Sequence, residues 1–212
     1  MSMKKIWDIS PPLDETSAVF PGDITYSQRL HFSLSSDCPV NVNSITLSPH
    51  TGAHADAPLH YAASGATSGE LSLTPYLGRC RVIHCIDVGP LVRPEHVAHA
   101  LHDLPERVLI RTSRVAKQDW GPFSALAEEL IDYLAINSIA NKLLLVGLDT
   151  PSVDPADSQT LPSHQRLHAL DLRVLENLVL DEVPEGDYEL IALPLKLVRA
   201  DASPVRAILR QL

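Results

Sequence analysis

Residues 50–61 read H-T-G-A-H-A-D-A-P-L-H-Y, which sets three histidines and one aspartate in the spacing H-x3-H-x-D-x3-H. Imidazole nitrogens and carboxylate oxygens are the usual protein ligands of zinc and similar divalent ions. A metal ion with an open coordination position lowers the pKa of a bound water and produces hydroxide near neutral pH. The stretch therefore predicts the metal-binding loop of a metal-dependent hydrolase.

The backbone of this loop is expected to be extended or irregular, because Gly52 and Pro58 disfavour a regular helix. In an extended segment, His54 and Asp56 project to the same side. A turn at the glycine, which tolerates positive φ, would fold His50 back towards them. We therefore predict that His50, His54 and Asp56 are metal ligands, and the two oxygens of Asp56 could bridge two ions.

The third histidine of the motif, His60, follows a proline and allows two interpretations. It is either a fourth ligand or a free imidazole beside the metal, and we favour the second because an imidazole with a pKa near 6.5 suits proton transfer. A lone histidine is most often a solvated residue without a special role. Four potential ligands in one loop framed by Gly, Ala and Pro favour the metal site instead.

Length and composition are those of a single globular domain spanning residues 1–212. The formal charge of −9 argues against a nucleic-acid or anionic-membrane surface. The first ten residues lack the apolar segment of a secretory signal, and no apolar run is long enough to span a bilayer. Three cysteines, Cys38, Cys80 and Cys85, suit reduced thiols in the cytoplasm better than a disulfide framework, and the last two are expected to pack in a strand.

Strands are expected to dominate the fold, which predicts a mixed, strand-rich α/β domain. Predicted strands cover residues 6–9, 25–32, 40–47, 80–87, 107–111, 143–148 and 188–193, followed by two more around a Pro-marked turn. The alternation V-N-V-N from Val40 is typical of a half-buried strand, and this strand leads directly into His50. Helices are predicted over 93–104 and over 124–139, the latter with Ser124 as N-cap.

A further helix is predicted to begin after Asp171 as its N-cap, with Leu172, Leu175 and Val179 on its buried face. Glu176 lies on the same face, where a carboxylate is costly unless it is paired or bound to a cation. A salt bridge to an arginine is one explanation. A second metal site, with His164 as co-ligand, is the other, and spacing alone does not decide between them.

Two other patterns are weaker indications of chemistry. His96, His99 and His102 could in principle gather a metal, but no carboxylate accompanies them, and a solvated helical face is favoured. The small-residue loop at 62–69 contains no G-x-S-x-G, which argues against a serine hydrolase.

The motif at residues 50–60 resembles that of the metal-dependent cyclase/hydrolase family, and the resemblance extends over almost the whole chain. The matching segments are W-D-I-S-P-P-L-D from Trp7, P-G-D from Pro21, C-P-V-N-V from Cys38, G-L-D-T-P-S-V-D-P from Gly147, V-L-E-N-L from Val174, L-P-L-K from Leu193 and D-A-S-P-V-R-A from Asp201. Matches this extended are more specific than the histidine motif alone.

The resemblance implies a swivelling β/β/α fold, a homodimer and an arylformamidase activity. The implied reaction is hydrolysis of N-formyl-L-kynurenine to L-kynurenine and formate, in tryptophan degradation by the kynurenine pathway, and it uses two Zn²⁺ ions per subunit. Mn²⁺ and Co²⁺ also suit such nitrogen and oxygen ligands. One ion is implied on His50, His54 and a shared Asp56, and the second on His164 and Glu176.

The resemblance also implies roles for two further residues. His60 takes the place of the acid/base histidine, and Phe20 takes the place of a tryptophan that lines the aromatic end of the substrate pocket. Phenylalanine keeps a ring for stacking but lacks the indole N–H donor. The alternatives are a related hydrolase of a cyclic amide such as isatin, and a non-enzymatic metal-binding protein. A closed structural zinc site usually has four protein ligands, often cysteines, and the central motif has no cysteine.

Overall fold

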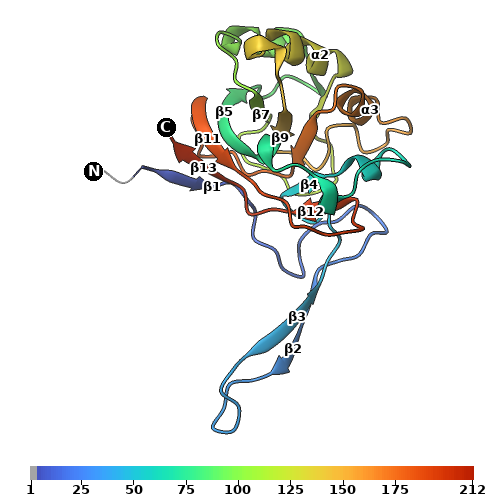
Figure 1. The fold of residues 1–212 in the computed structure, drawn as a ribbon, viewed down its shortest axis with the longest axis vertical. Helices are drawn as coiled ribbons and strands as arrows, with labels where there is room; N and C mark the ends of the chain where they lie inside the picture. The colour runs from blue at the N-terminus through green and yellow to red at the C-terminus, as the bar shows by residue number, and fades with distance from the viewer. Residues whose placement is uncertain (1–3) are drawn as a thin grey trace.

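The computed structural model describes residues 4–212, and its main element is a nine-stranded mixed sheet (Figure 1). In spatial order the strands are β1 (Ile6–Asp8), β13 (Ile208–Gln211), β11 (Gly186–Ile191), β5 (Leu77–His84), β7 (Arg107–Arg111), β9 (Leu145–Leu148), β10 (Arg173–Glu176), β4 (His54–Asp56) and β12 (Ala202–Pro204). The four strands from β5 to β10 are parallel to one another, and the strands on both sides are antiparallel. The predicted strand-rich α/β fold is confirmed.

Three α-helices lie on one side of the sheet: α1 (Pro94–Val97), α2 (Glu128–Asn137) and α3 (Pro162–Ala169) (Figure 1). Short 3₁₀ helices lie at Pro58–His60, Ser68–Glu70, Thr74–Tyr76, Ala98–Ala100 and Ile139–Asn141. Alternate residues of the central strands pack against the helices, and those between them form a second core on the other face. On β7, for example, Val108 and Ile110 belong to the helix side and Leu109 to the opposite core.

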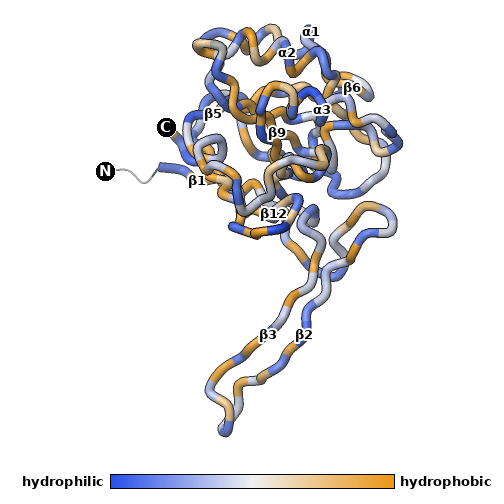
Figure 2. The backbone as a smooth tube through the Cα atoms, turned by 45° about the vertical axis from the view of Figure 1, so that its right-hand side comes forward, coloured by the Kyte–Doolittle hydropathy of each residue, from blue (hydrophilic) through white to orange (hydrophobic). Residues whose placement is uncertain are grey.

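Two small sheets complete the fold. The strands β6 (Leu91–Val92) and β8 (Ala125–Leu126) form a short parallel pair. The strands β2 (Ser27–Phe32) and β3 (Val42–Thr46) form a hairpin that extends away from the body (Figures 1 and 2). The expectation that the segment at Val40 is half-buried is therefore wrong, because every residue of both hairpin strands is exposed. The prediction that this segment leads into His50 is confirmed.

Two helix predictions need correction. The helix α2 begins at Glu128, and Ser124 is not its N-cap, because the Ser124 hydroxyl donates to the carbonyl of Gly89. The segment after Asp171 is the strand β10 and not a helix. It is held between β9 and β4 by main-chain pairing on both sides, and these long-range contacts override the local helical pattern.

The remaining expectations concern surface and core residues. Cys80 and Cys85 are buried free thiols, as expected for strand packing. The predicted helix over 93–104 is shorter than expected, since α1 ends at Val97 and the 3₁₀ helix after it ends at Ala100. His99 in that 3₁₀ helix and His102 in the following turn lie at the surface near Glu185 and Asp103, so they are solvated as expected. Across residues 4–212, the described helices include none with the length and apolar character that crossing a membrane requires.

Candidate metal centre

The short strand β4 presents His54 and Asp56 on one face of the sheet. Glu176 of β10 lies directly opposite His54 in the antiparallel register, and residues paired in this way point to the same side. This is the side that α3 covers, and α3 contributes His164. His50 precedes β4 through a turn in which Gly52 has φ +65°. A Cβ at Gly52 would clash with the end of the Leu13 side chain, so only glycine fits this position without rearrangement.

Two carboxylates and two imidazoles converge at the centre of the site. The Nε2 atom of His54 lies 3.4 Å from Oδ1 of Asp56 and 3.2 Å from Oε2 of Glu176. The Nε2 atom of His164 lies 3.3 Å from Oδ2 of Asp56 and 3.4 Å from Oε1 of Glu176. His50 approaches from the pocket side, with its Nδ1 3.0 Å from Oδ1 of Asp56. Asp56 therefore lies between two groups of side chains, with one oxygen towards each.

Three imidazoles are held through the nitrogen that points away from this centre. In His54, Nδ1–H donates to the carbonyl of Gly52 at 2.8 Å. In His164, Nδ1 lies 2.7 Å from Asp154, whose carboxylate also accepts the first amides of α3. In His50, Nε2 lies 3.2 Å from Asp201. Anchors of this kind set the tautomer and ring orientation of metal-ligating histidines.

Burial and charge at the centre favour a cation. Asp56 and Glu176 are 0% and 3% exposed, and two converging carboxylates are costly to bury unless positive charge compensates them. Burial raises the pKa of Asp56, but contacts with His164 and His50 outweigh it and hold this pKa well below its usual range. Burial lowers the pKa of His50, but the hydrogen bond with Asp201 and the nearby Asp56 carboxylate raise it to about 10.

Two atoms at the centre have no hydrogen-bond partner: Nε2 of His54 and Oδ1 of Asp56. Both are buried, and buried polar atoms are normally satisfied. A divalent cation is the ligand that would satisfy a nitrogen lone pair and a carboxylate oxygen together. His50, His54 and Asp56 offer ligand atoms within 4.8 Å of one another, and so do Asp56, His60 and His164. The residues present therefore fit a metal ion.

His60 lies at the rim of the centre and is partly exposed. Its Nδ1 lies 3.2 Å from Oδ2 of Asp201, the same oxygen that contacts His50. Since a carboxylate only accepts, Nδ1–H is the donor in this hydrogen bond. The Nε2 atom is then free to exchange a proton with a bound molecule.

These residues line a cavity of about 490 Å³, which is large enough for a small aromatic molecule. Phe20 and Trp120 form one wall and meet edge to face, with ring centroids 4.9 Å apart. The structure thus brings all the residues predicted from the sequence, His50, His54, Asp56, His60, His164, Glu176 and Phe20, to a single pocket.

Three residues of the site were not predicted from the sequence: Asp154, Asp201 and Trp120. Asp154 lies in the loop D-T-P-S-V-D-P, which by itself indicates only turn chemistry. Asp154 and Asp201 both belong to segments of the family resemblance, G-L-D-T-P-S-V-D-P and D-A-S-P-V-R-A, and this was the available signal for both. Nothing in the local sequence distinguishes Trp120 from any other loop aromatic.

Comparison with known proteins finds relatives that match nearly the whole chain. The Cyclase family model matches residues 7–155. The chain is 71% identical to the kynurenine formamidase of Polaromonas naphthalenivorans strain CJ2 over 208 residues, covering 98% of this chain and 92% of that protein. It is 59% identical to the kynurenine formamidase of Bordetella pertussis strain Tohama I over 212 residues, covering 99% and 100%.

Solved structures show the same fold. A predicted metal-dependent hydrolase from Bacillus stearothermophilus is 27% identical, with a TM-score of 0.82 and full coverage of both chains. Isatin hydrolase A from Labrenzia aggregata is 24% identical, with a TM-score of 0.78 and coverage of 98% and 94%, and at this identity the likeness concerns the fold alone. By its sequence match, its fold and its convergent histidines and carboxylates, this chain belongs to the cyclase family of metal-dependent hydrolases.

Proposed function

We propose that this enzyme hydrolyses N-formyl-L-kynurenine to L-kynurenine and formate, the arylformamidase step of tryptophan degradation by the kynurenine pathway. The observation that carries the proposal is identity of 59 to 71% to kynurenine formamidases over nearly the whole chain. The pocket supports it, because a cation-compatible centre lies beside an aromatic wall in a cavity of suitable size.

Two divalent ions, zinc in the first instance, are proposed as cofactors. His50, His54 and Asp56 would hold one ion, and Asp56, Glu176 and His164 would hold the other. The split follows from the two oxygens of Asp56, one near His50 and His54 and the other near His164. When bound, such ions supply Lewis acidity and lower the pKa of a water molecule.

We assign proton transfer to the leaving group and binding of the substrate to side chains of the protein. Breaking the formyl C–N bond releases an aromatic amine, which needs a proton. His60 is proposed to take up a proton at Nε2 from the attacking water and to pass it to the amine, while Asp201 accepts the hydrogen bond from Nδ1–H on the opposite side of the ring. Phe20 and Trp120 are proposed to hold the arene against the wall, so that the small formyl group lies at the centre.

We also propose that the protein is a homodimer and that it is located in the cytoplasm. The family resemblance supports the homodimer. The buried free thiols of Cys80 and Cys85 support the cytoplasmic location, because free thiols suit a reducing compartment.

The test is hydrolysis of N-formyl-kynurenine, followed by absorbance, before chelation and after adding back zinc, manganese or cobalt. We expect rapid turnover that chelation abolishes and that one of these metals restores. Isatin is the control substrate, and it should be hydrolysed slowly or not at all. A folded, metal-loaded protein without turnover of N-formyl-kynurenine would refute the proposal, and turnover of isatin would point to the cyclic-amide alternative.

Asp154→Asn is expected to weaken metal binding, because Asp154 orients His164 without contacting the centre itself. Replacing the anchor of a metal-ligating histidine typically lowers metal affinity by roughly 10- to 100-fold. Titration with a competing chelator measures the change. Asp157→Asn, in the exposed part of the same loop, is the matched control and should bind metal normally. Equal affinities in the two variants would rule out an orienting role for Asp154.

Trp120→Ala is expected to raise KM for N-formyl-kynurenine roughly 3- to 10-fold, the scale of one lost aromatic contact. Since the ring lies on the cavity wall and not at the centre, kcat should change little. Steady-state kinetics of Trp120→Ala and Trp120→Phe check this, and the phenylalanine variant should retain most of the affinity. A fall in kcat at unchanged KM would show that Trp120 does not act by binding the arene.

A further inference from the structure

Three carboxylates line the cavity, and two of them are already engaged. Glu176 lies against two imidazoles at the buried centre, and Asp201 contacts two others at the rim. The third is Asp23, which forms no ion pair with any residue between 4 and 212. Its Oδ1 accepts a hydrogen bond from the amide of Ile24 at 2.6 Å, and its Oδ2 accepts none from the described chain. Asp23 is therefore the carboxylate of the cavity whose charge is available to a bound molecule.

Asp23 lies at the mouth of the cavity. Its side chain is partly exposed and the residues on either side are exposed, whereas His54 and Glu176 at the inner end are buried. Its amide donates to the carbonyl of Phe20 at 2.9 Å, so the same turn carries the aromatic wall and this carboxylate. A molecule with its ring on Phe20 and its reacting group at the centre thus has its outer end within reach of the turn.

The fixed charge at the mouth favours a cation there. Among residues 4–212, no lysine or arginine lines the cavity, so the negative charge of Asp23 has no positive competitor. A carboxylate that is partly shielded from water attracts a cation more strongly than one in bulk solvent. An ammonium group at the outer end of a bound molecule fits this arrangement.

The cavity also offers hydroxyl donors. Three serines line it: Ser48, Ser152 and Ser158. Each hydroxyl oxygen accepts a hydrogen bond from a main-chain amide, at 3.1 to 3.4 Å, and none donates one to another residue of the described chain. Since a hydroxyl carries one hydrogen to donate, these O–H groups remain for a bound molecule. Ser158 is the one at the mouth, because it is partly exposed in the turn before α3 while the other two are buried.

We propose that Asp23 and Ser158 bind the α-amino-acid end of the substrate. The carboxylate of Asp23 accepts hydrogen bonds from the ammonium group, and the hydroxyl of Ser158 donates to the carboxylate group. The inference rests on the proposed function, because N-formyl-kynurenine carries both groups on the last carbon of its side chain. It assigns the preference for an amino acid over a simple aryl formamide to two residues outside the metal centre.

A series of three formamides tests the two contacts separately. N-formyl-kynurenine carries the ammonium and the carboxylate, its deamino analogue keeps the carboxylate only, and ortho-formamidoacetophenone keeps neither. All three share the ring, the ketone and the formamide, so the bond that breaks is the same. For the metal-loaded wild type, kcat/KM should fall roughly 10-fold when the ammonium is lost, the scale of a hydrogen bond between charged groups. Loss of the carboxylate should lower it roughly 3- to 10-fold further.

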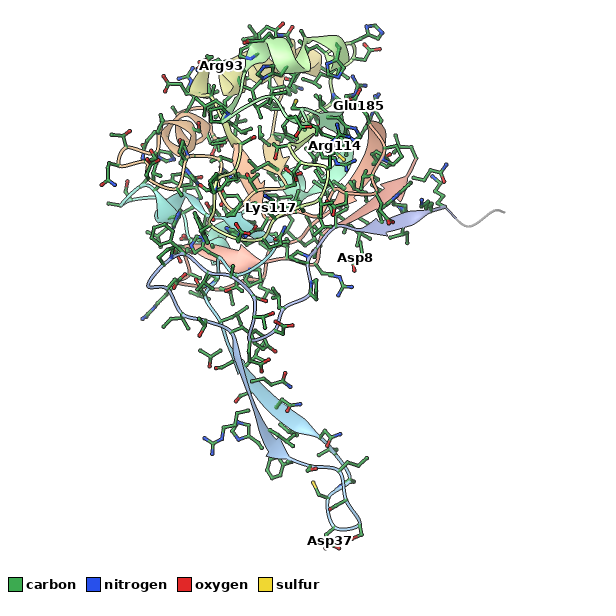
Figure 3. All side chains as sticks on the ribbon, turned by 180° about the vertical axis from the view of Figure 1, so that it is seen from behind. Asp8, Asp37, Arg93, Arg114, Lys117 and Glu185 are labelled. Atoms are coloured by element: carbon green, nitrogen blue, oxygen red, sulfur yellow. The ribbon has the colours of Figure 1, made fainter. Side chains whose placement is uncertain are left out.

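Two variants assign these ratios to residues. Asp23→Asn keeps an acceptor for the amide of Ile24 and removes the charge, so it should abolish the preference for N-formyl-kynurenine over the deamino analogue. Ser158→Ala should instead abolish the preference for the deamino analogue over ortho-formamidoacetophenone. The matched control is Asp37→Asn, whose side chain lies at the tip of the hairpin away from the body (Figure 3), and it should keep both ratios.

Ratios separate a lost contact from general damage, because a disturbed centre lowers kcat/KM for all three formamides together. An unchanged first ratio in Asp23→Asn, or an unchanged second ratio in Ser158→Ala, would overturn the role of that residue. Equal kcat/KM of the wild type for all three would overturn the subsite as a whole, and this comparison needs no variant to fold. Absence of turnover of N-formyl-kynurenine by the wild type is a different result, which would refute the proposed function and the subsite with it.

Discussion

His60→Ala is expected to lose roughly 10²- to 10⁴-fold in kcat for N-formyl-kynurenine, the usual contribution of a general acid. His60 lies on the rim of the centre, held by Asp201, and is the side chain that we propose protonates the leaving amine. Because it is not needed to hold an ion in this assignment, metal content should equal that of the wild type. Steady-state kinetics and elemental analysis of the same sample measure both quantities.

If His60 is instead a metal ligand, a different result is expected for His60→Ala. His60 also offers a ligand atom close to those of Asp56 and His164. If it binds an ion, His60→Ala should lose metal together with activity. His102→Ala is the matched control, because its side chain is 95% exposed on the surface, and it should change neither quantity. Partial recovery of kcat with added imidazole would support proton transfer, since a lost structural contact is not restored in this way.

The central motif could be interpreted from the sequence because its geometry is local. The i,i+2 spacing of His54 and Asp56 needs only an extended backbone to place both side chains on one face, and β4 provides it. The turn at Gly52 is likewise set by a single residue with positive φ. Local chemistry of this kind does not depend on the rest of the chain.

Glu176 shows the limit of such reasoning. The sequence singled it out as a costly carboxylate on the buried face of a helix, but it lies at the end of β10, opposite His54. Burial was predicted correctly and the element was not, because strand pairing across more than one hundred residues overrides local propensity. Asp154 and Asp201 escaped notice for the same reason, since their partners are distant in sequence or lie on another element.

For the hairpin of β2 and β3, by contrast, the strands were predicted correctly and their burial was not. The alternation from Val40 predicted a half-buried strand, but every residue of β2 and β3 is exposed. Alternation of apolar and polar residues predicts that one face of a strand is buried, but it does not identify the surface that buries it.

Asp56→Asn is expected to abolish binding of the two proposed metal ions and to lower kcat/KM by roughly 10³-fold or more, since such ions would supply the largest electrostatic contribution to the reaction. The carboxylate is fully buried, and its two oxygens face different groups of histidines. An amide of the same shape removes the negative charge and places an NH₂ group where one ion would bind. The measurements are metal content and the rise in Tm on adding zinc, which bound metal causes by stabilising the folded state.

The control for this variant is Asp171→Asn, a carboxylate with an 87% exposed side chain at a positive-φ position that asparagine also tolerates. It should keep the metal content, the Tm response and the activity of the wild type. In Asp56→Asn, full metal content would exclude Asp56 as a ligand. Half of the wild-type content would assign Asp56 to one ion only. Loss of both ions is the outcome expected for a carboxylate shared between two metals. Among the described carboxylates, only Glu176 also lies against both groups of histidines, and this variant leaves it in place.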